Sequence, residues 1–400
     1  MFRGITKRPF QRQRKNLAMK TSTERILTTH VGSLPRPDSL IALLRKKDRG
    51  DPYDHLAFDQ CVSAAVDDVV ARQVAAKIDL VSDGEMSKIS YATYLKDRLN
   101  GFDGTAQENR AAGDLLDFIS YARRLVEQGG TERSLQGPAC DGPLSVRDDT
   151  VLDKDLANFS AAVTEHQPME GFLTAPSPGV VTVFLQNQYY PDHDAYLEAL
   201  AEILKAEYEA IVASGAVLQV DCPDLAMGRH IVHRKKSVTE FRKAAARHIE
   251  VLNAATADIP PESMRLHLCW GNYAGPHHHD IALSDIIDLV YTARPQAISV
   301  EGANPRHGHE WIVFDRHPLP DGKIIIPGVI DSTSNFIEHP ELVAQRICAY
   351  ASKVGRERVV AGADCGFATF AERPAVDPDI AWAKLGALVE GAGMASDRLW

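Results

Sequence analysis

The chain is predicted to be an α/β protein, a (β/α)8 TIM barrel with an inserted excursion between its second and third strands. Eight short apolar, β-branched runs alternate with segments of helical periodicity. That alternation is typical of a parallel sheet whose strands are joined by helical crossovers. Polar residues gather at the carboxyl ends of several of these runs, which is where a barrel of this kind carries its active site.

The eight runs are interpreted as buried strands because each is five or six residues long and rich in Val, Ile and Leu. The strand ends are followed by sequences dense in polar groups, such as HVGSLPRP after the first run and DGEMSK after the second. The expected strands are residues 26–31, 79–83, 171–175, 217–221, 265–269, 297–301, 324–329 and 358–363.

The intervening segments carry apolar residues at three- and four-residue steps, the pattern of an amphipathic helix. A final helix is expected to close the chain. The expected helices are residues 55–78, 195–215, 237–256, 285–293, 340–355 and about 377–392.

The stretch between the second and third strands, about residues 85–170, is too long for a simple crossover, and its LQGPACDGPLSV piece is interpreted as an inserted hairpin or excursion. Because the chain shows no internal repeat, low-complexity tract or Gly/Ser linker, residues 23–400 are predicted to be a single domain. Residues 1–22 are basic and contain no acidic residue before position 21. They are interpreted as a disordered arm, or as sequence upstream of a start at Met19, and they lack the apolar core of a secretion signal.

Composition excludes several classes of partner. The net charge of −10 argues against nucleic acid, because no basic face is available to neutralise phosphates. No apolar run approaches the roughly 20 residues that a membrane-spanning helix needs. The six cysteines form no dense framework, which favours a cytoplasmic location with reduced thiols.

One set of residues at the strand ends predicts a metal site. It combines two thiolates, one imidazole and one carboxylate, a tetrahedral set that suits Zn²⁺. The spacing is too wide for a zinc finger, so the fold itself would have to assemble the site. The predicted ligands are His267, Cys269, Glu301 and Cys365.

At these residues the chain resembles the catalytic barrel of cobalamin-independent methionine synthase. The wider family includes epoxyalkane:coenzyme M transferases, and the fold is shared with uroporphyrinogen decarboxylase. The resemblance covers about nine tenths of the chain, from Thr23 onward. The chain resembles the short, single-barrel type of synthase, without the second, degenerate barrel of the long synthases. Its motifs occur in family order: TTHVGSLPRP, SDGEM, TAPSPG, LQVDCPDL, LHLCWGN, ISVEGAN, IPGVIDS and GADCGF.

The resemblance implies that the four predicted ligands bind catalytic zinc and that the thiol substrate joins the zinc and becomes a thiolate, the nucleophilic form. It implies methionine biosynthesis, with the amino-acid part of homocysteine lying against Gly32 and Ser33. It also implies that the carboxylates of Glu85 and Asp221 bind the ammonium group of that substrate. His30, two residues before Gly32, either donates to the substrate or satisfies a buried carbonyl.

Two departures from the family concern the methyl donor. The family motif has a histidine after the seventh strand, where this chain has Asp331, Ser332 and Thr333. The family tryptophan that stacks on the pterin is missing, with Tyr189 or Tyr190 as the available substitute. The residues that the resemblance assigns to zinc and thiol binding are retained, whereas those that it assigns to the methyl donor have changed. The pattern therefore favours an alkyl donor other than folate.

Several candidate residues have two readings. Asp331 either contacts the donor or caps the turn that follows it. His307 or His309 could replace the missing histidine as proton donor, because histidine titrates near neutral pH, and otherwise they belong to a solvated loop. The PHHHD segment at 276–280 has a metal-binding composition but is interpreted as a solvated or substrate-gating loop.

The predicted function is zinc-dependent methyl or alkyl transfer to a small thiol such as homocysteine. The alternative within the same chemistry is epoxide ring opening by a zinc-bound thiolate of the coenzyme M type. An alternative of another class is a non-catalytic protein that binds zinc and thiols. The expected partners are a small-molecule thiol and an alkyl donor, and the sequence leaves the oligomeric state open.

Overall fold

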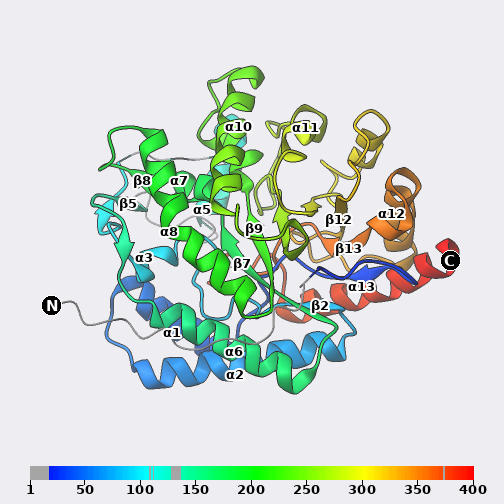
Figure 1. Cartoon of the computed structure of the whole chain (residues 1–400), viewed down its shortest axis with the longest axis horizontal. Coiled ribbons are helices and arrows are strands. Elements are labelled where there is room, and N and C mark those ends of the chain that lie inside the picture. The colour runs from blue at the N-terminus through cyan, green and yellow to red at the C-terminus, as the bar shows by residue number, and fades with distance from the viewer. Residues whose placement is uncertain (1–17, 108–109, 111, 128–136, 373) are drawn as a thin grey trace.

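The computed structural model describes residues 18–107, 110, 112–127, 137–372 and 374–400. Eight parallel strands form one sheet in the order β1-β13-β12-β11-β10-β9-β7-β2, and this sheet curls into a nearly closed barrel (Figure 1). The predicted fold class is therefore confirmed. The strands are β1 (Leu27–Thr28), β2 (Leu80–Val81), β7 (Glu170–Pro176), β9 (Val217–Asp221), β10 (Met264–His267), β11 (Ala297–Val300), β12 (Ile324–Ile330) and β13 (Val360–Ala363).

The barrel closes between β1 and β2 through Asp79. Its backbone N–H donates to the carbonyl of Thr28 at 3.2 Å, and its carboxylate accepts from the backbone N–H of Thr28 at 2.9 Å and from the Thr28 hydroxyl at 3.0 Å. The Asp79 carboxylate thus accepts the hydrogen bond from the Thr28 N–H that a backbone carbonyl of a neighbouring strand would otherwise accept. This explains why β1 and β2 have only two residues each, shorter than the predicted runs 26–31 and 79–83.

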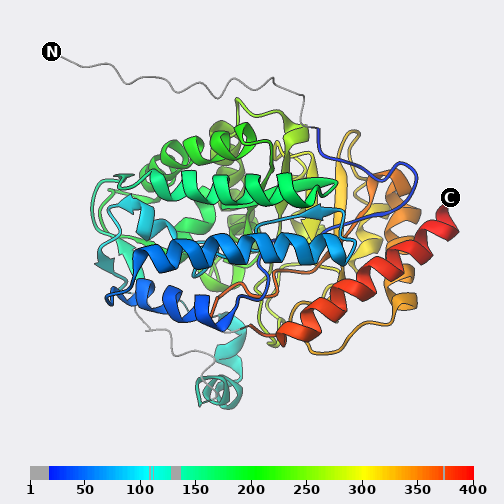
Figure 2. The ribbon, with the colours of Figure 1, turned by 90° about the horizontal axis from the view of Figure 1, so that it is seen from below.

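Long helices surround the sheet, with α2 packed beside α6 and α12 beside α13 (Figure 2). Side-chain caps begin several of them: Asp54 accepts from two backbone N–H groups of α2, and Ser237 with Glu240 forms a capping box on α10. The long helices are α1 (Asp38–Arg49), α2 (His55–Ala75), α6 (Thr150–His166), α8 (His193–Ala213), α10 (Val238–Ala255), α12 (Pro340–Val354) and α13 (Pro378–Leu399).

The other helices are short. The predicted helix 285–293 is only α11 (Ile287–Val290), preceded by the 3-10 helix η3 (Leu283–Asp285). The crossover from β11 to β12 likewise contains a 3-10 helix, η4 (Glu310–Asp315). Two more short α-helices are α7 (Pro178–Phe184) and α9 (Gly228–Ile231), and α3 (Leu95–Arg98) lies in the segment between β2 and β7.

The excursion between the second and third barrel strands is present as predicted. Strands β3 (Leu99–Asn100) and β6 (Ser145–Val146) pair in antiparallel fashion. Strand β5 (Pro138–Cys140) pairs with β4 (Gly104–Thr105) and with β8 (Gln186–Asn187), which follows β7. The excursion also contains α4 (Gly113–Asp117) and α5 (Ile119–Glu127).

Residues 1–17 of the predicted arm lie outside the described residues, whereas its last residues contact the barrel. Met19 is buried, and its backbone N–H donates to the carbonyl of Glu262 at 2.7 Å. The hydroxyl of Ser22 donates to the carbonyl of Val359 at 2.5 Å. Among the described residues, no helix combines the length and the apolar character needed to cross a bilayer.

Arg265 fills the interior of the barrel below the strand ends. Its guanidinium lies 3.4 Å from the ring centre of Phe172 and donates to Gln219 Oε1 at 2.7 Å and to the carbonyl of His30 at 2.7 Å. Gln219 Nε2 in turn donates to Asp221 Oδ1 at 2.7 Å. A buried charge is tolerated only when its donors are satisfied, so this network fixes the side chains directly beneath the candidate site.

Candidate metal and substrate site

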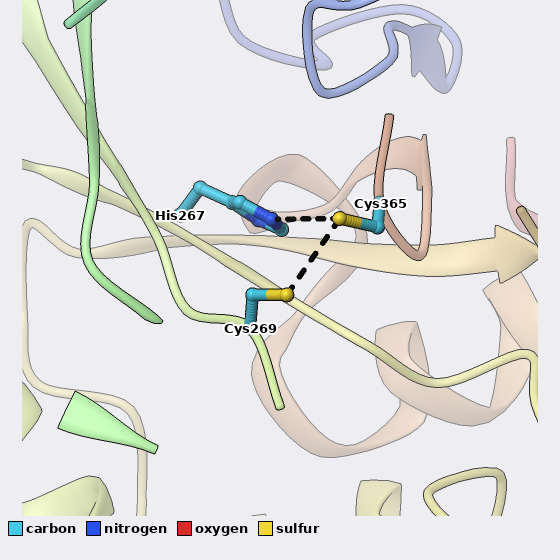
Figure 3. Close-up of side chains that lie close together, drawn as sticks. All are labelled: His267, Cys269 and Cys365. Carbon is cyan, nitrogen blue, oxygen red and sulfur yellow. Dashed lines mark hydrogen bonds between the residues drawn. The ribbon is translucent and has the colours of Figure 1, made fainter. Parts of the chain in front are cut away.

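Three of the four predicted metal ligands converge at the carboxyl ends of β10 and β13 (Figure 3). His267 is the last residue of β10, Cys269 follows two residues later, and Cys365 lies two residues beyond the end of β13. Cys365 Sγ lies 3.6 Å from His267 Nε2 and 3.6 Å from Cys269 Sγ. Two strands separate β10 from β13 in the sheet, so the curvature of the barrel brings these ligands together.

The spacing of the three donor atoms suits tetrahedral zinc. Zinc–sulfur bonds of about 2.3 Å and zinc–nitrogen bonds of about 2.0 Å place two sulfur ligands about 3.8 Å apart, and a sulfur and a nitrogen about 3.5 Å apart. The observed separations are both 3.6 Å. A disulfide would need about 2.05 Å between the sulfurs, and both cysteines are free. The donor set and its geometry therefore fit the metal that the sequence predicts.

Burial sets the protonation of these ligands. It lowers the pKa of His267 to about 3, with a smaller contribution from the charge of Arg265, so the imidazole is neutral and offers a lone pair. The pKa of Cys269 is raised well above its usual range by the hydrogen bond to Cys365 and by burial. Metal binding must therefore displace a proton from this thiol, as ligation by thiolate requires.

Glu301 follows β11 and lies next to the triad rather than within it. Its Oε1 accepts from the backbone N–H of Trp270 at 2.8 Å, and its Oε2 accepts from Asn304 Nδ2 at 2.8 Å. Burial, followed by the nearby Cys269, raises the pKa of this carboxyl well above its usual range. At this site, the donor atoms that all lie within 4.8 Å of one another are those of His267, Cys269 and Cys365, without Glu301. Ligation by Glu301 thus stays a prediction.

Asp364, which the sequence analysis did not single out, locks the loop after β11 onto the end of β13. Its carboxylate accepts from the backbone N–H groups of Gly302, Ala303 and Asn304, each at 2.8 Å. The side chain thereby fixes Glu301 and Cys365 relative to one another, since each is the immediate neighbour of a residue in this cluster.

A cavity of about 170 Å³ opens beside the triad and is lined by all three of its members. Ser33, Glu85 and Asp221, predicted to bind the substrate, line the same cavity. Its wall also includes Tyr91 and Phe184, whose rings meet edge to face with centroids 5.6 Å apart. The structure therefore gathers metal ligands and candidate substrate contacts from five different strand ends into one space.

Glu85 enters the cavity from a strained turn. Gly84 and Glu85 both have left-handed backbone conformations, with φ of 65° and 57°, and such strain in a non-glycine residue is typical of functional sites. Glu85 Oε1 accepts from the Thr174 hydroxyl at 3.0 Å, whereas the buried Oε2 finds no hydrogen-bond partner among the described residues. Burial raises the pKa of this carboxyl. Arg36 Nη2 lies 3.9 Å from this oxygen, beyond hydrogen-bond distance, so Oε2 retains the capacity to accept a hydrogen bond from a bound cation.

Asp221, the last residue of β9, is the second carboxyl of this cavity. Burial and the neighbouring Glu85 raise its pKa well above the usual range. Gly32 leaves the necessary room, because a Cβ at its φ of 142° would lie 2.6 Å from Thr174 Cγ2 and 2.9 Å from Glu85 Oε1. The two carboxylates would repel each other when both are charged, and a positive charge between them would be stabilised.

A second cavity of about 160 Å³ is also lined by Cys365. It shares the segment Gly271–Tyr273 with the first cavity. Its own wall contains Glu301, Asp331, Thr333 and Arg306. Asp331 Oδ1 accepts from the backbone N–H of Thr333 at 2.9 Å and from its hydroxyl at 2.8 Å, so Asp331 caps this turn. Contact of Asp331 with the donor stays a prediction.

Other predicted residues lie away from the cavities. His30 is buried, accepts from the backbone N–H of Gly32 at 3.2 Å through Nδ1 and pairs with Gln73 Oε1 at 2.7 Å through Nε2. It therefore supports the Gly32 turn. His307 is buried with Nδ1 2.8 Å from Glu310 and Nε2 3.0 Å from Asp280, so both ring nitrogens are already engaged.

His309 is exposed at the start of η4. Tyr189 is also exposed, and the hydroxyl of Tyr190 accepts from the backbone N–H of Leu144 at 3.0 Å. None of these three residues lines either of the two cavities. The geometry thus does not favour the tyrosines as substitutes for the stacking tryptophan.

His230 and Asn272 are polar lining residues that the sequence analysis did not single out. His230 on α9 lines the first cavity, with Nε2 3.1 Å from the carbonyl of Trp270 and Nδ1 without a hydrogen-bond partner among the described residues. Asn272 lines both cavities and donates to the carbonyl of Gly366 at 2.7 Å and to the Thr369 hydroxyl at 2.6 Å. Asn272 could have been found, because it belongs to the LHLCWGN motif that contains two predicted ligands. His230 could not, because it lies in a basic run that resembles a solvated helix start.

Comparison with protein families matches residues 26–378 to the catalytic domain of the cobalamin-independent synthases. The chain is 23% identical over 344 residues to the 5-methyltetrahydropteroyltriglutamate–homocysteine methyltransferase of Aeromonas salmonicida, a match that covers 86% of this chain and 40% of that protein. The chain thus spans well under half of the length of this longer relative.

Shorter relatives match over most of their length. The methionine synthase of Sulfolobus acidocaldarius is 25% identical over 342 residues, which is 85% of each chain. A B12-independent methionine synthase from a Shewanella species, solved in complex with selenomethionine, superposes with a TM-score of 0.69 at 19% identity and covers 94% of this chain and 99% of that chain. This structural likeness supports the barrel fold.

Proposed function

The chain belongs to the family of cobalamin-independent synthase catalytic domains, and from this premise we propose that it transfers a methyl group to the sulfur of a small amino-acid thiol of the homocysteine type. The observation that carries the proposal is a single cavity that joins a buried His-Cys-Cys triad to two buried carboxyls. In a small molecule with a thiol at one end and an ammonium group at the other, the sulfur could bind at the triad and the ammonium group between the carboxyls.

His267, Cys269 and Cys365 would hold the metal, with Glu301 as the residue nearest to them that can complete the set. When bound, zinc supplies a Lewis acid that lowers the pKa of the substrate thiol and favours its nucleophilic form. The backbone N–H of Gly271 donates to Cys269 Sγ at 3.2 Å. That hydrogen bond stabilises negative charge on a ligand sulfur and keeps its orientation fixed.

Glu85 and Asp221 would bind the substrate ammonium. Glu85 Oε2 accepts no hydrogen bond among the described residues and lies 3.9 Å from Arg36 Nη2. The pKa of each carboxyl is raised chiefly by burial. A cation between them would favour ionisation of both groups. Gly32 and Ser33 would place the substrate carboxylate, as the family resemblance implies, so that the thiol end of the substrate points toward the triad.

Methyl transfer to sulfur is a displacement that depends on alignment of the two reactants, and the barrel loops would supply it. Tyr91 and Phe184 make the cavity wall apolar on one side and would exclude water from the reacting atoms. His230 lines the same cavity, and its Nδ1 makes no hydrogen bond among the described residues and lies 3.9 Å from Asp114 Oδ1. This imidazole would be the group that exchanges a proton there. It takes the role first considered for His307 and His309.

The methyl donor would approach through the second cavity, which shares Cys365 and Asn272 with the first. Thr333 lines this cavity at the position where the family motif has a histidine. A donor other than methylfolate is proposed on that ground, because the histidine that the family motif has is absent from the wall of this cavity.

The test is zinc content combined with a thiol panel. Purified protein is assayed for metal and then titrated with homocysteine, coenzyme M and glutathione while proton release is followed, with Cys365→Ser as the site variant and Cys348→Ala as a cysteine control outside the site. One zinc and proton release with homocysteine, both lost in C365S, are expected. A response to coenzyme M instead would favour epoxide opening. Zinc without any thiol response would leave the non-catalytic alternative and overturn the proposal.

A further inference from the structure

A second group of metal-type ligands lies at the surface, outside both cavities. It consists of Asp117, the last residue of α4, and the adjacent His278 and His279 in the loop that follows β10. Asp117 Oδ2 lies 2.9 Å from His278 Nε2 and 2.6 Å from His279 Nε2. His278 and His279 are 161 and 162 positions from Asp117 in the chain, yet both imidazoles contact the same carboxylate oxygen.

The three donor atoms all lie within 4.8 Å of one another. A divalent cation with bonds of about 2.0–2.1 Å to nitrogen and oxygen would place neighbouring ligands roughly 3 Å apart, close to the separations seen. The side chains are 51%, 37% and 47% exposed for Asp117, His278 and His279. An ion from solvent can therefore reach them without any rearrangement of the barrel.

We propose that Asp117, His278 and His279 form a second binding site for a borderline divalent cation of the zinc type. Two imidazoles and one carboxylate suit zinc, nickel, cobalt or copper rather than calcium or magnesium, which prefer oxygen ligands. The site has no thiolate and retains exposed coordination positions for water, so it binds more weakly than the inner triad. Each imidazole gives its Nε2 lone pair to the ion and carries its proton on Nδ1.

The surrounding contacts hold the two imidazoles in place. The rings of His278 and His279 pack against each other with centroids 4.2 Å apart, and His278 also meets the ring of Phe118 edge to face at 5.3 Å. Ligands that are already ordered lose less entropy when the ion binds. Two neighbouring histidines on a solvated loop would ordinarily point apart, and here both contact the same carboxylate.

An ion at this site would tie the inserted excursion to a loop of the substrate cavities. Tyr273 lines both cavities and His277 lines the second. Helix α4 already contacts this loop through Asp114, whose Oδ2 accepts from the backbone N–H of His277 at 3.0 Å and from the hydroxyl of Tyr273. Asp117 lies three residues further along the same helix and would add a second tie. The cyan and teal helices of the excursion extend from the body of the barrel in Figure 2.

The experiment uses cobalt as the probe on the full chain. Stoichiometry is measured by equilibrium dialysis, and absorbance separates the two sites, because only the inner triad contains sulfur and gives a thiolate-to-cobalt band. The site variants are Asp117→Asn and His278→Ala combined with His279→Ala. The matched control is His166→Ala, which removes a surface histidine 2.8 Å from the carboxylate of Asp67 but has only one imidazole.

Wild type and H166A are expected to bind two equivalents, and the site variants one equivalent with the thiolate band intact. D117N is expected to weaken the second equivalent by at least about tenfold, since removing one of three ligands lowers affinity steeply. An intact thiolate band also shows that each variant is folded. Binding of a single equivalent by wild type, or a second equivalent that survives in the double histidine variant, would overturn the proposal.

Amide hydrogen exchange of residues 271–280 tests whether the ion restrains this loop against helix α4. Cobalt beyond the first equivalent should slow exchange of this loop in wild type and H166A but leave it unchanged in the site variants. If a second ion binds and exchange does not change, the ion does not restrain the loop and that part of the proposal is wrong. Neither the cobalt stoichiometry nor the amide exchange depends on turnover, so both could still be interpreted if the proposed methyl transfer were wrong.

Discussion

Cys269 Sγ and Cys365 Sγ lie 3.6 Å apart, although 96 positions separate the two residues in the chain. Each cysteine follows a different barrel strand by two residues, so their meeting depends on closure of the sheet. The separation is too long for a disulfide and suits two ligands of one metal ion. The barrel therefore places a thiol pair at the point where the predicted substrate cavity begins.

Replacing Cys269 by Ser should remove zinc from the protein. A hydroxyl is a far weaker ligand than a thiolate for a soft site, and the remaining His267 and Cys365 cannot complete a tetrahedral set. Metal analysis after dialysis should show a loss of roughly one zinc per chain, that is, at least about a hundredfold weaker binding, since ligand loss costs several kcal/mol. Cys348→Ala, a thiol on α12 outside the site, should keep full occupancy. Retention of zinc by C269S would contradict the assignment of this ligand.

Replacing Glu85 by Gln should weaken use of the amino-acid thiol. A charge-assisted hydrogen bond to a buried group contributes about 1.5–3 kcal/mol, which corresponds to a fall of about 10- to 100-fold in kcat/KM for homocysteine. A simple thiol without an ammonium group should show a much smaller change, and this comparison separates loss of recognition from damage to the fold. Equal losses with both thiols would mean that Glu85 does not bind the ammonium.

Gly32→Ala should destabilise the protein. The new Cβ would lie 2.6 Å from Thr174 Cγ2 at a backbone φ of 142°, and strain of this kind costs about 1–3 kcal/mol. Gly386→Ala is the control, because this glycine lies in α13 with open space around it, and alanine there should stabilise the helix by up to about 1 kcal/mol. Denaturant unfolding measures both changes. A neutral G32A would show that the turn can relax without loss.

Sequence patterns predicted the barrel and most of the site because both depend on local signals. Strand β9 has the predicted bounds, and the ligands His267, Cys269 and Cys365 could be identified from their positions at strand ends. The missing parts depend on contacts between distant segments. Helix α4 brings Asp114 and Asp117 against the loop after β10, and no local pattern in residues 113–117 indicates that loop. Likewise, Asp79 shortens β1 through a side-chain contact that hydrophobic periodicity does not record.

Stability should depend on pH through His307. Burial lowers the pKa of His307, but the hydrogen bonds to Asp280 and Glu310 and the charges of Glu301 and Glu310 outweigh burial and raise this pKa to about 10 in the folded protein. An unfolded histidine titrates near about 6.5. The folded state therefore holds a proton that the unfolded state loses. The contribution of His307 is fully present below about pH 6.5 and is lost as the pH rises toward about 10.

The check compares the free energy of unfolding of wild type and His307→Gln at several pH values from 6 to 10. Wild type should lose stability relative to H307Q across this window, so the difference between the two proteins shrinks as the pH rises. His309→Gln is the control, because this neighbouring histidine is exposed and should leave the slope of the wild type unchanged. Parallel curves for wild type and H307Q would mean that His307 does not carry the extra proton in the folded state.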